Sequence, residues 1–143
     1  MKRKTKDERR RTRSLYEGLQ KNVRGLKTSR IEVWKNQYAD KEYAITLDIP
    51  EFTCICPKTG LPDFAVLRIE YSPVEYCVEL KSFKLYLLFY RDVGIFHEHL
   101  VNRVLDDFVT ACKPRWVKIT GVFNPRGGIT TSVLVEWSRP KSA

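Results

Sequence analysis

The residues with the clearest chemical potential are a cysteine and an aspartate on one short loop. Cys56 follows an alternating apolar segment, and Asp63 lies across a turn rich in Pro and Gly. A loop thiol near a carboxyl group is typical of covalent catalysis, in which a thiolate attacks an electrophilic carbon and the acid manages the proton. Because like charges repel, the pair favours an aspartate that is protonated when the thiol is ionised. A buried structural cysteine beside a turn aspartate fits the same spacing.

Two lysines form a second candidate site. Lys81 and Lys84 lie three residues apart, on one face of a predicted helix whose start Ser82 is expected to cap. Cations at the positive end of a helix dipole favour anionic groups such as cofactor phosphates. A solvated charged face is the commoner explanation of this pattern.

A third candidate group lies at the start of a later predicted helix. Phe96 offers a stacking face beside His97, and Glu98 can accept two hydrogen bonds from a purine-like edge. Core packing or helix capping explains such a short run as well. Arg126, in an exposed turn before two glycines, suits a phosphate contact, although Gly-Gly turns are also common in hairpins for conformational reasons alone.

Apolar periodicity predicts the elements that must position these residues. Alternation predicts four strands and helical spacing predicts two helices, in the order strand, strand, helix, helix, strand, strand. The helices are expected at about 81–91 and 96–112. This order predicts an α+β fold, an antiparallel sheet with two helices on one face. The open face and edges of such a sheet predict association of subunits.

The charge distribution divides the chain into two predicted parts. The net charge is +9, and residues 1–30 hold 12 Lys and Arg against 3 Asp and Glu. The remaining residues hold 14 of each sign and are neutral. We therefore predict a basic arm over 1–30, with a thin helical stripe from Leu15 to Leu26, and one domain over 31–143. A basic arm is typical of a solvated tail or an RNA contact.

Several classes of protein and site are disfavoured. No apolar stretch approaches the ~20 residues of a membrane span, and no apolar region follows the basic start as in a secretory signal. We expect a cytoplasmic chain whose four cysteines stay reduced. The spacing of those cysteines and of the two histidines lacks the short pairs of a zinc site, so no metal is expected. No P-loop or GxGxxG motif is present.

Taken together, these residues resemble the 7-cyano-7-deazaguanine reductase family, the NADPH-dependent nitrile reductases of queuosine biosynthesis, in its short single-module form. The resemblance spans about residues 38–140. It rests on segments that follow one another in the family's order: Glu51–Thr53, Cys56–Gly60, Pro62–Ala65, Glu79–Tyr86, Phe96–Glu98 and Pro125–Ile129. It implies a tunnelling fold, in which β-β-α-α-β-β units assemble into an oligomeric barrel with active sites between subunits.

The resemblance also implies a role for each candidate residue. Cys56 is similar to the nucleophile that forms a covalent thioimide with the nitrile, and Asp63 is similar to the proton donor. The substrate 7-cyano-7-deazaguanine is expected to contact Val78, Glu79, Leu80, Phe96, His97 and Glu98. The cofactor NADPH is expected to contact Lys81, Lys84 and Arg126.

Three other functions explain part of the sequence. A sister group of amidinotransferases resembles the reductases, keeps the cysteine and the acid, and converts cyano-deazaguanine within tRNA to archaeosine without NADPH. The basic arm suits tRNA, but the complete Glu79–Tyr86 segment is the one linked to reduction. A zinc cyclohydrolase of the same fold would need a ligand set not evident here. A non-catalytic RNA-binding module would leave the Cys56–Asp63 loop idle and predicts a basic rather than a neutral body.

Overall fold

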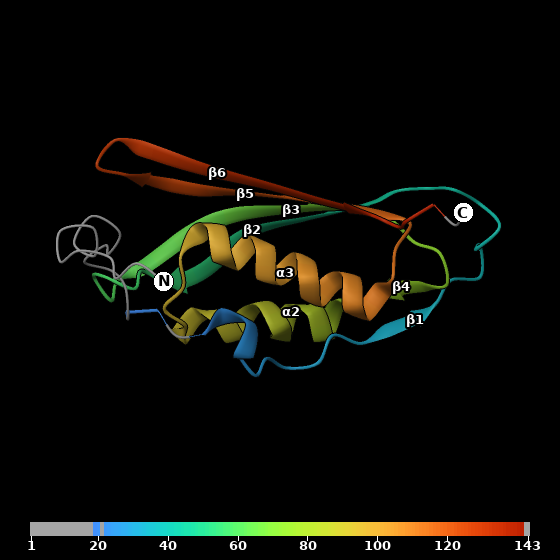
Figure 1. The fold of residues 1–143 in the computed structure, drawn as a ribbon, viewed down its shortest axis with the longest axis horizontal. Coiled ribbons are helices and arrows are strands. Elements are labelled where there is room, and N and C mark those ends of the chain that lie inside the picture. Colours follow the sequence, from blue (N-terminus) through green and yellow to red (C-terminus); the bar gives the residue numbers. More distant parts are fainter. Residues whose placement is uncertain (1–18, 21, 142–143) are drawn as a thin grey trace, which may run out of the picture.

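The molecule is built on a four-stranded antiparallel sheet that carries both helices on one face (Figure 1). The computed structural model describes residues 19, 20 and 22–141. The large sheet has the order β2-β3-β5-β6 and is formed by β2 (Ile45–Ile55), β3 (Pro62–Ser72), β5 (Trp116–Arg126) and β6 (Ile129–Ser138). A second sheet pairs β1 (Val33–Lys35) with β4 (Tyr76–Val78). The helices are α2 (Leu80–Leu88) and α3 (His97–Cys112), with short 3-10 turns η1 (Val23–Gly25) and η2 (Phe89–Asp92).

The core forms where one face of the sheet meets the apolar stripe of α3. Every second residue of β3 points inward and is buried: Asp63, Ala65, Leu67, Ile69 and Tyr71. Helix α3 buries a stripe at helical spacing: Leu100, Val101, Val104, Leu105, Phe108 and Cys112. Burying one large apolar side chain contributes about 1.5–3 kcal/mol to folding. This packing fixes α3, and with it the residues at its start, against β5 and β6.

A glycine in β5 lets α3 approach the sheet closely. A Cβ atom on Gly121 would lie 2.9 Å from Cγ2 of Val101 and 3.2 Å from Cδ2 of Leu67. Real Cβ atoms do not come this close to carbon, so a larger residue would push the helix outward.

A β-bulge in β2 decides which side chains reach the core near the loop. Ile49 pairs with Leu67 and Phe52 with Ala65, so β2 holds one extra residue at Pro50-Glu51. Odd-numbered residues face the core before the bulge, and the even-numbered Phe52 and Cys54 are buried after it. Cys54 pairs with Asp63, so the bulge brings the end of β2 onto the face of that carboxyl group.

The predicted α+β order is confirmed, with differences at the ends of elements. Strand β3 begins at Pro62, inside the loop predicted over residues 56–63, and shortens it to residues 56–61. The prediction that Ser82 caps α2 is wrong, since Glu79 holds the N-cap position. The predicted arm helix does not form in the described residues: Val23–Gly25 make a single 3-10 turn and Leu26 is extended. Leu15 lies outside the described residues.

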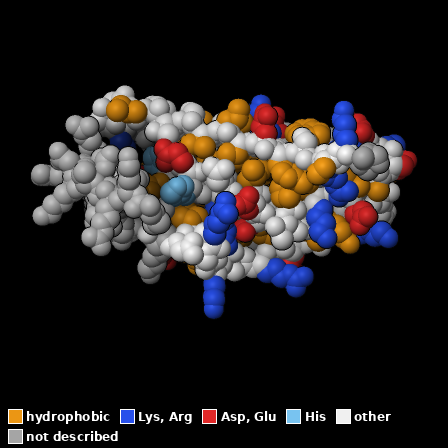
Figure 2. Space-filling model, viewed as in Figure 1, with side chains coloured by type: hydrophobic (Ala, Val, Ile, Leu, Met, Phe, Trp, Pro, Cys, Tyr) orange, Lys and Arg blue, Asp and Glu red, His pale blue; other side chains and the backbone are white. Residues whose placement is uncertain are grey.

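The surface of the folded body is mixed in charge. Lys and Arg side chains and Asp and Glu side chains are interspersed over the face in Figure 2 rather than gathered by sign. This agrees with the balance of 14 and 14 over residues 31–143. Within the described part of the chain, no helix combines the length and apolar character that a membrane crossing requires.

Candidate active site

The loop between β2 and β3 is a tight turn that holds Cys56 at its start. The Cys56 amide donates to the carbonyl oxygen of Leu61 at 2.9 Å, and the Gly60 amide donates to the Cys56 carbonyl oxygen at 2.9 Å. Gly60 has φ +69°, a left-handed conformation that glycine adopts without strain. The Thr59 hydroxyl accepts a hydrogen bond from the Leu61 amide at 3.2 Å and lies inside the turn.

The turn makes the Cys56 thiol unusually acidic. Partial burial raises the pKa of Cys56, but hydrogen bonds outweigh it and lower the pKa from 9.0 to about 7. The donors to the sulfur are the Thr59 hydroxyl, the amides of Thr59 and Lys58, and the Arg126 guanidinium. At neutral pH a large fraction of Cys56 is therefore thiolate, the nucleophilic form.

The other cysteines do not share this environment. Cys54, Cys77 and Cys112 are buried. Burial raises the pKa of Cys54 to about 12, with Asp63 adding to the effect, and burial also raises the pKa of Cys112 to about 12. The structure thus singles out Cys56 as the reactive thiol.

Asp63 is buried and held between two basic groups. It is 4% exposed, and its Oδ2 lies 3.1 Å from Nε2 of His97. Its Oδ1 makes an ion-pair contact with the Arg126 guanidinium. Asp63 therefore faces an imidazole on one carboxyl oxygen and a guanidinium on the other.

Backbone pairing brings the start of α3 to the cysteine loop. The Ile55 amide donates to the Val93 carbonyl oxygen at 3.0 Å, and the Ile95 amide donates to the Ile55 carbonyl oxygen at 3.1 Å. These bonds form a parallel bridge between Ile55 and Gly94, directly before Cys56. The next turn begins α3, so His97 arrives beside Asp63. Its ring stacks on Phe123 with the centroids 3.7 Å apart, which fixes the imidazole plane.

Arg126 belongs to this cluster. Its guanidinium contacts Asp63 and the Cys56 sulfur, and it donates to the Pro62 carbonyl oxygen at 3.2 Å. Sequence reasoning expected Arg126 to contact a phosphate. The structure places its charge beside the Asp63 carboxyl group and the Cys56 sulfur, where it favours the thiolate.

The candidate substrate residues lie at two opposite ends of the folded molecule. Phe96 and Glu98 flank His97 at the start of α3, and Glu98 is exposed. Val78, Glu79 and Leu80 lie at the corner between β4 and α2, at the opposite end of the molecule from the β2–β3 loop (Figure 1). One chain therefore does not bring the two predicted halves of the substrate site together.

Comparison with known proteins identifies the family. Over 110 residues the chain is 53% identical to the NADPH-dependent 7-cyano-7-deazaguanine reductase of Nitrosococcus oceani, which covers 77% of this chain and 85% of that protein. The enzyme of the same name from Halorhodospira halophila is 56% identical over 106 residues, 74% of this chain and 90% of that protein. The family model described as QueF-like protein matches residues 62–142. The chain belongs to this reductase family.

A solved structure supports the fold of the family member. The archaeosine synthase QueF-Like in its apo form is 26% identical and aligns with a TM-score of 0.61. The alignment covers 65% of this chain and 91% of that one. This likeness, together with the observed order of strands and helices, confirms the predicted β-β-α-α-β-β unit of the tunnelling fold.

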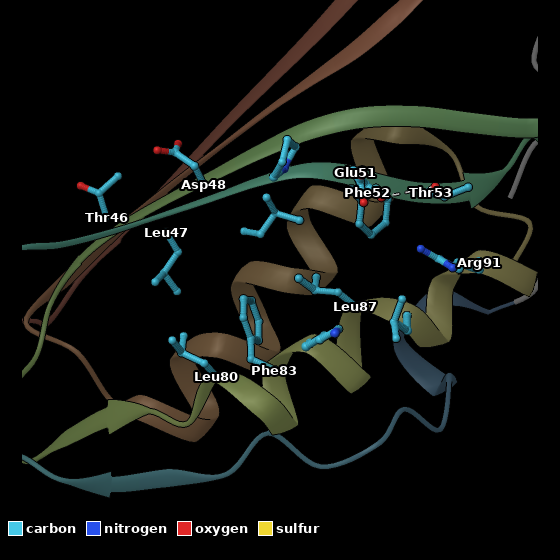
Figure 3. Close-up of a pocket in the computed structure, with 14 residues that line it drawn as sticks. Thr46, Leu47, Asp48, Glu51, Phe52, Thr53, Leu80, Phe83, Leu87 and Arg91 are labelled. Carbon is cyan, nitrogen blue, oxygen red and sulfur yellow. Dashed lines mark hydrogen bonds between the residues drawn. The ribbon is translucent and has the colours of Figure 1, made fainter.

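The two predicted cofactor lysines lie on α2, away from the cysteine cluster. Lys84 lines a groove of about 430 Å³ between β2 and α2, together with Arg91. Leu47 of β2 and Leu80, Phe83 and Leu87 of α2 point toward one another across it (Figure 3). Lys81 is exposed one turn earlier. The groove combines apolar walls with two cations, Lys84 and Arg91, and two carboxylates, Asp48 and Glu51. Its apolar walls fit a ring, and Lys84 and Arg91 are its groups for an anionic substituent.

The sequence patterns did not predict two residues that shape the site of this reductase. Thr59 is the side-chain donor to the Cys56 sulfur, and Phe123 supports the His97 ring. A hydroxyl in a tight turn three residues after a cysteine was the available signal for Thr59. Phe123 carried no signal, because its contact with His97 joins β5 to α3.

Proposed function

We propose that this chain reduces the nitrile of 7-cyano-7-deazaguanine to a primary amine, with Cys56 as nucleophile and Asp63 as proton donor. The observation that carries the proposal is the acidic thiol of Cys56, held in the family's loop beside a buried carboxyl group. Membership of a family whose curated relatives are NADPH-dependent reductases supplies the reaction type.

The first step is addition of the thiolate to the nitrile carbon. A carbon–sulfur bond forms, one π bond of the nitrile breaks, and the nitrogen takes a proton to give a thioimide on Cys56. A nitrile is a weak electrophile, and protonating its nitrogen keeps an unstable anion from accumulating. Water would hydrolyse the adduct, so the reaction needs an enclosed site.

Asp63 and His97 supply the proton path. Oδ1 of Asp63 contacts the Arg126 guanidinium, and Oδ2 lies within hydrogen-bond distance of His97. In the proposal, Asp63 gives its proton to the nitrile nitrogen, and His97 exchanges a proton with it across the 3.1 Å contact. Stacking on Phe123 keeps the imidazole in line for this exchange.

NADPH, when bound, supplies the two hydrides that convert the nitrile to an amine, one from each of two molecules. Lys81 and Lys84 are the residues we propose to hold its phosphates, and the apolar walls of the groove beside Lys84 fit its rings. Arg126 donates to the reacting sulfur, which is its first role. The predicted contact with a phosphate of NADPH is proposed as its second role.

We further propose that two copies of the chain complete each site. Glu98 and His97 lie at one end of a subunit, and the Val78–Leu80 corner lies at the other (Figure 1). Both are expected to contact one small substrate, and a neighbouring copy would bring the second group to the first. A reduced Cys56 also requires a reducing compartment, so the proposal places the enzyme in the cytoplasm.

One assay tests the function. The full chain is mixed with 7-cyano-7-deazaguanine and NADPH, and NADPH absorbance, product and intact protein mass are followed together. The expected result is two NADPH consumed for each amine formed, with a transient mass increase that maps to Cys56. Cys56→Ala should show neither, while Cys54→Ala, which changes a buried thiol of the same strand, should retain the adduct.

The archaeosine synthase likeness makes an amidinotransferase the second candidate. The same assay separates the two functions, because an amidinotransferase would form the Cys56 adduct and leave NADPH untouched. That outcome would overturn the reductase proposal. The identity of 53–56% to the reductases, against 26% to the synthase, favours reduction.

A further inference from the structure

A glutamine that precedes the predicted domain contacts the helix that carries His97. Oε1 of Gln20 accepts a hydrogen bond from the Phe96 amide at 2.8 Å, and Nε2 of Gln20 lies 2.6 Å from Nδ1 of His99. Phe96 is the N-cap residue of α3 and has no side-chain acceptor of its own. In a capping box, a polar side chain three positions into the helix accepts a hydrogen bond from the N-cap amide. Gln20 accepts that hydrogen bond here, although it belongs to a distant segment.

An arginine holds this segment on the helix. We call residues 19, 20 and 22–26 the anchor segment. Arg103 of α3 donates to the carbonyl oxygens of Val23 and, at 2.8 Å, of Leu26. Its Nε also donates to Asp107 at 2.8 Å, so the guanidinium is fixed on both sides. The anchor segment is thus fastened to α3 at two separate points, although sequence reasoning assigned it to the basic arm.

The contact made by Arg103 is rigid because its partner Asp107 belongs to a buried hydrogen-bond network. The Tyr86 hydroxyl donates to Asp107 at 2.6 Å and lies 2.9 Å from the Tyr90 hydroxyl. Both tyrosines are fully buried, so Arg103 cannot move without disturbing the core between α2 and α3. Such support fixes the path of the chain that delivers Gln20 to the start of α3.

The start of α3 is where small displacements matter most. His97 is its first residue, and the contact of His97 with Asp63 is 3.1 Å. The Phe96 amide held by Gln20 is one residue before it. Loss of the hydrogen bond would let the first turn fray, because the amides at a helix start have no partner within the helix.

We propose that Gln20 is a positioning residue for the reaction, which holds the first turn of α3 so that His97 meets Asp63. This rests on the proposed function, since it assumes that the His97–Asp63 contact serves the reaction at Cys56. The anchor segment is then part of the catalytic unit, whereas the basic residues before it are not required for this role.

The test compares Gln20→Ala, Gln20→Glu and Asn22→Ala in the full chain. Each rate is divided by the amount of Cys56 that reacts with the nitrile. Gln20→Ala should slow adduct formation without NADPH, and kcat with NADPH, by about tenfold, with KM for NADPH unchanged. Gln20→Glu should restore both rates, because a carboxylate accepts from the Phe96 amide and is favoured at a helix start. Asn22→Ala changes an amide of the same segment that makes no described hydrogen bond to α3, and should leave both rates unchanged.

The outcomes separate positioning from general stability and from the reaction itself. A lower melting temperature for Gln20→Ala with unchanged normalised rates would overturn the proposal, as would failure of Gln20→Glu to restore them. If the wild-type chain consumes no NADPH and forms no adduct, the proposed function fails. Amide hydrogen exchange over residues 93–100 then still decides the positioning: faster exchange in Gln20→Ala supports it, and equal exchange contradicts it.

Discussion

At the scale of single residues, the reactivity of Cys56 depends on its turn more than on the nearby acid. A carboxylate at Asp63 would raise the pKa of a neighbouring thiol, as it does for Cys54. At Cys56 the cause that raises the pKa is burial, and donors from Thr59, Lys58 and Arg126 outweigh it. Arg126 also contacts the Asp63 carboxyl group, so its positive charge faces both the acid and the thiol.

We predict that alkylation of Cys56 by iodoacetamide rises with pH to a midpoint near the pKa of about 7 and then levels off. Arg126 is the charged side chain that donates to the sulfur. Thr59→Val removes the donor hydroxyl at nearly constant shape, so its midpoint should move to higher pH. Thr59→Ser keeps the hydroxyl and should match the wild type. Intact mass with peptide mapping gives the rate, and an unchanged midpoint in Thr59→Val would refute the role of the hydroxyl.

Sequence reasoning reached the local part of the site and missed the part made by distant contacts. A tight turn joins Cys56 and Asp63, and the Pro and Gly residues in that turn predict that the two side chains lie close together. Phe123 and Gln20 are linked to α3 only through tertiary packing, which no pattern within one segment reveals. The predicted roles of the substrate and cofactor residues stay predictions until the assays above are made.

At the scale of elements, the apolar pattern predicted each helix and main strand but not the change of phase in β2. Alternation from Ile45 to Ile49, continued unbroken, would turn Cys54 outward. The extra residue at Pro50-Glu51 resets the phase, so Cys54 pairs with Asp63 on the core face. A proline inside a strand was the available signal, because it cannot donate to the ladder and is found at bulges. The short strands β1 and β4 have too few residues to show a period.

The start of α2 gives a prediction for stability. Both carboxylate oxygens of Glu79 accept backbone hydrogen bonds, from the Lys81 amide at 2.8 Å and the Ser82 amide at 2.7 Å. These bonds lower the pKa of Glu79 below its usual 4.5, with the Ser82 amide as the largest cause. The stabilisation is therefore present above the usual pKa and is lost as pH falls through the lowered one.

Glu79→Ala should lower the melting temperature at about pH 7, and the difference from wild type should shrink toward about pH 2. Circular dichroism across that range measures both. Glu75→Ala, an exposed glutamate just before β4, is the matched control and should change little. A difference that stays constant down to the lowest pH would show that Glu79 stabilises the protein by some means other than its ionised carboxylate.

At the scale of the whole molecule, a single subunit leaves much of its sheet uncovered. The edge strands β2 and β6 each have one unpaired side among the described residues. The face away from the helices carries large apolar side chains that remain exposed: Phe64, Val66, Val122 and Leu134. Edges and apolar faces of this kind are usually covered by another chain. Burial of these strands in an oligomer agrees with a substrate site divided between the two ends of the subunit.

Subunit complementation tests the divided site. Cys56→Ala removes the nucleophile, and Leu80→Asp changes the β4–α2 corner at an exposed first helical position where an acidic residue is tolerated. Each variant alone should be inactive. Co-expressed in equal amounts, they should regain about a quarter of wild-type activity, since random pairing leaves one site in four with both intact halves. Cys56→Ala with Asp63→Asn alters the same end twice and should regain none. The contrary result is a mixture of Cys56→Ala and Leu80→Asp that stays inactive although light scattering shows that both variants assemble normally. Each site would then be completed within one subunit, because pairing the two chains does not restore activity.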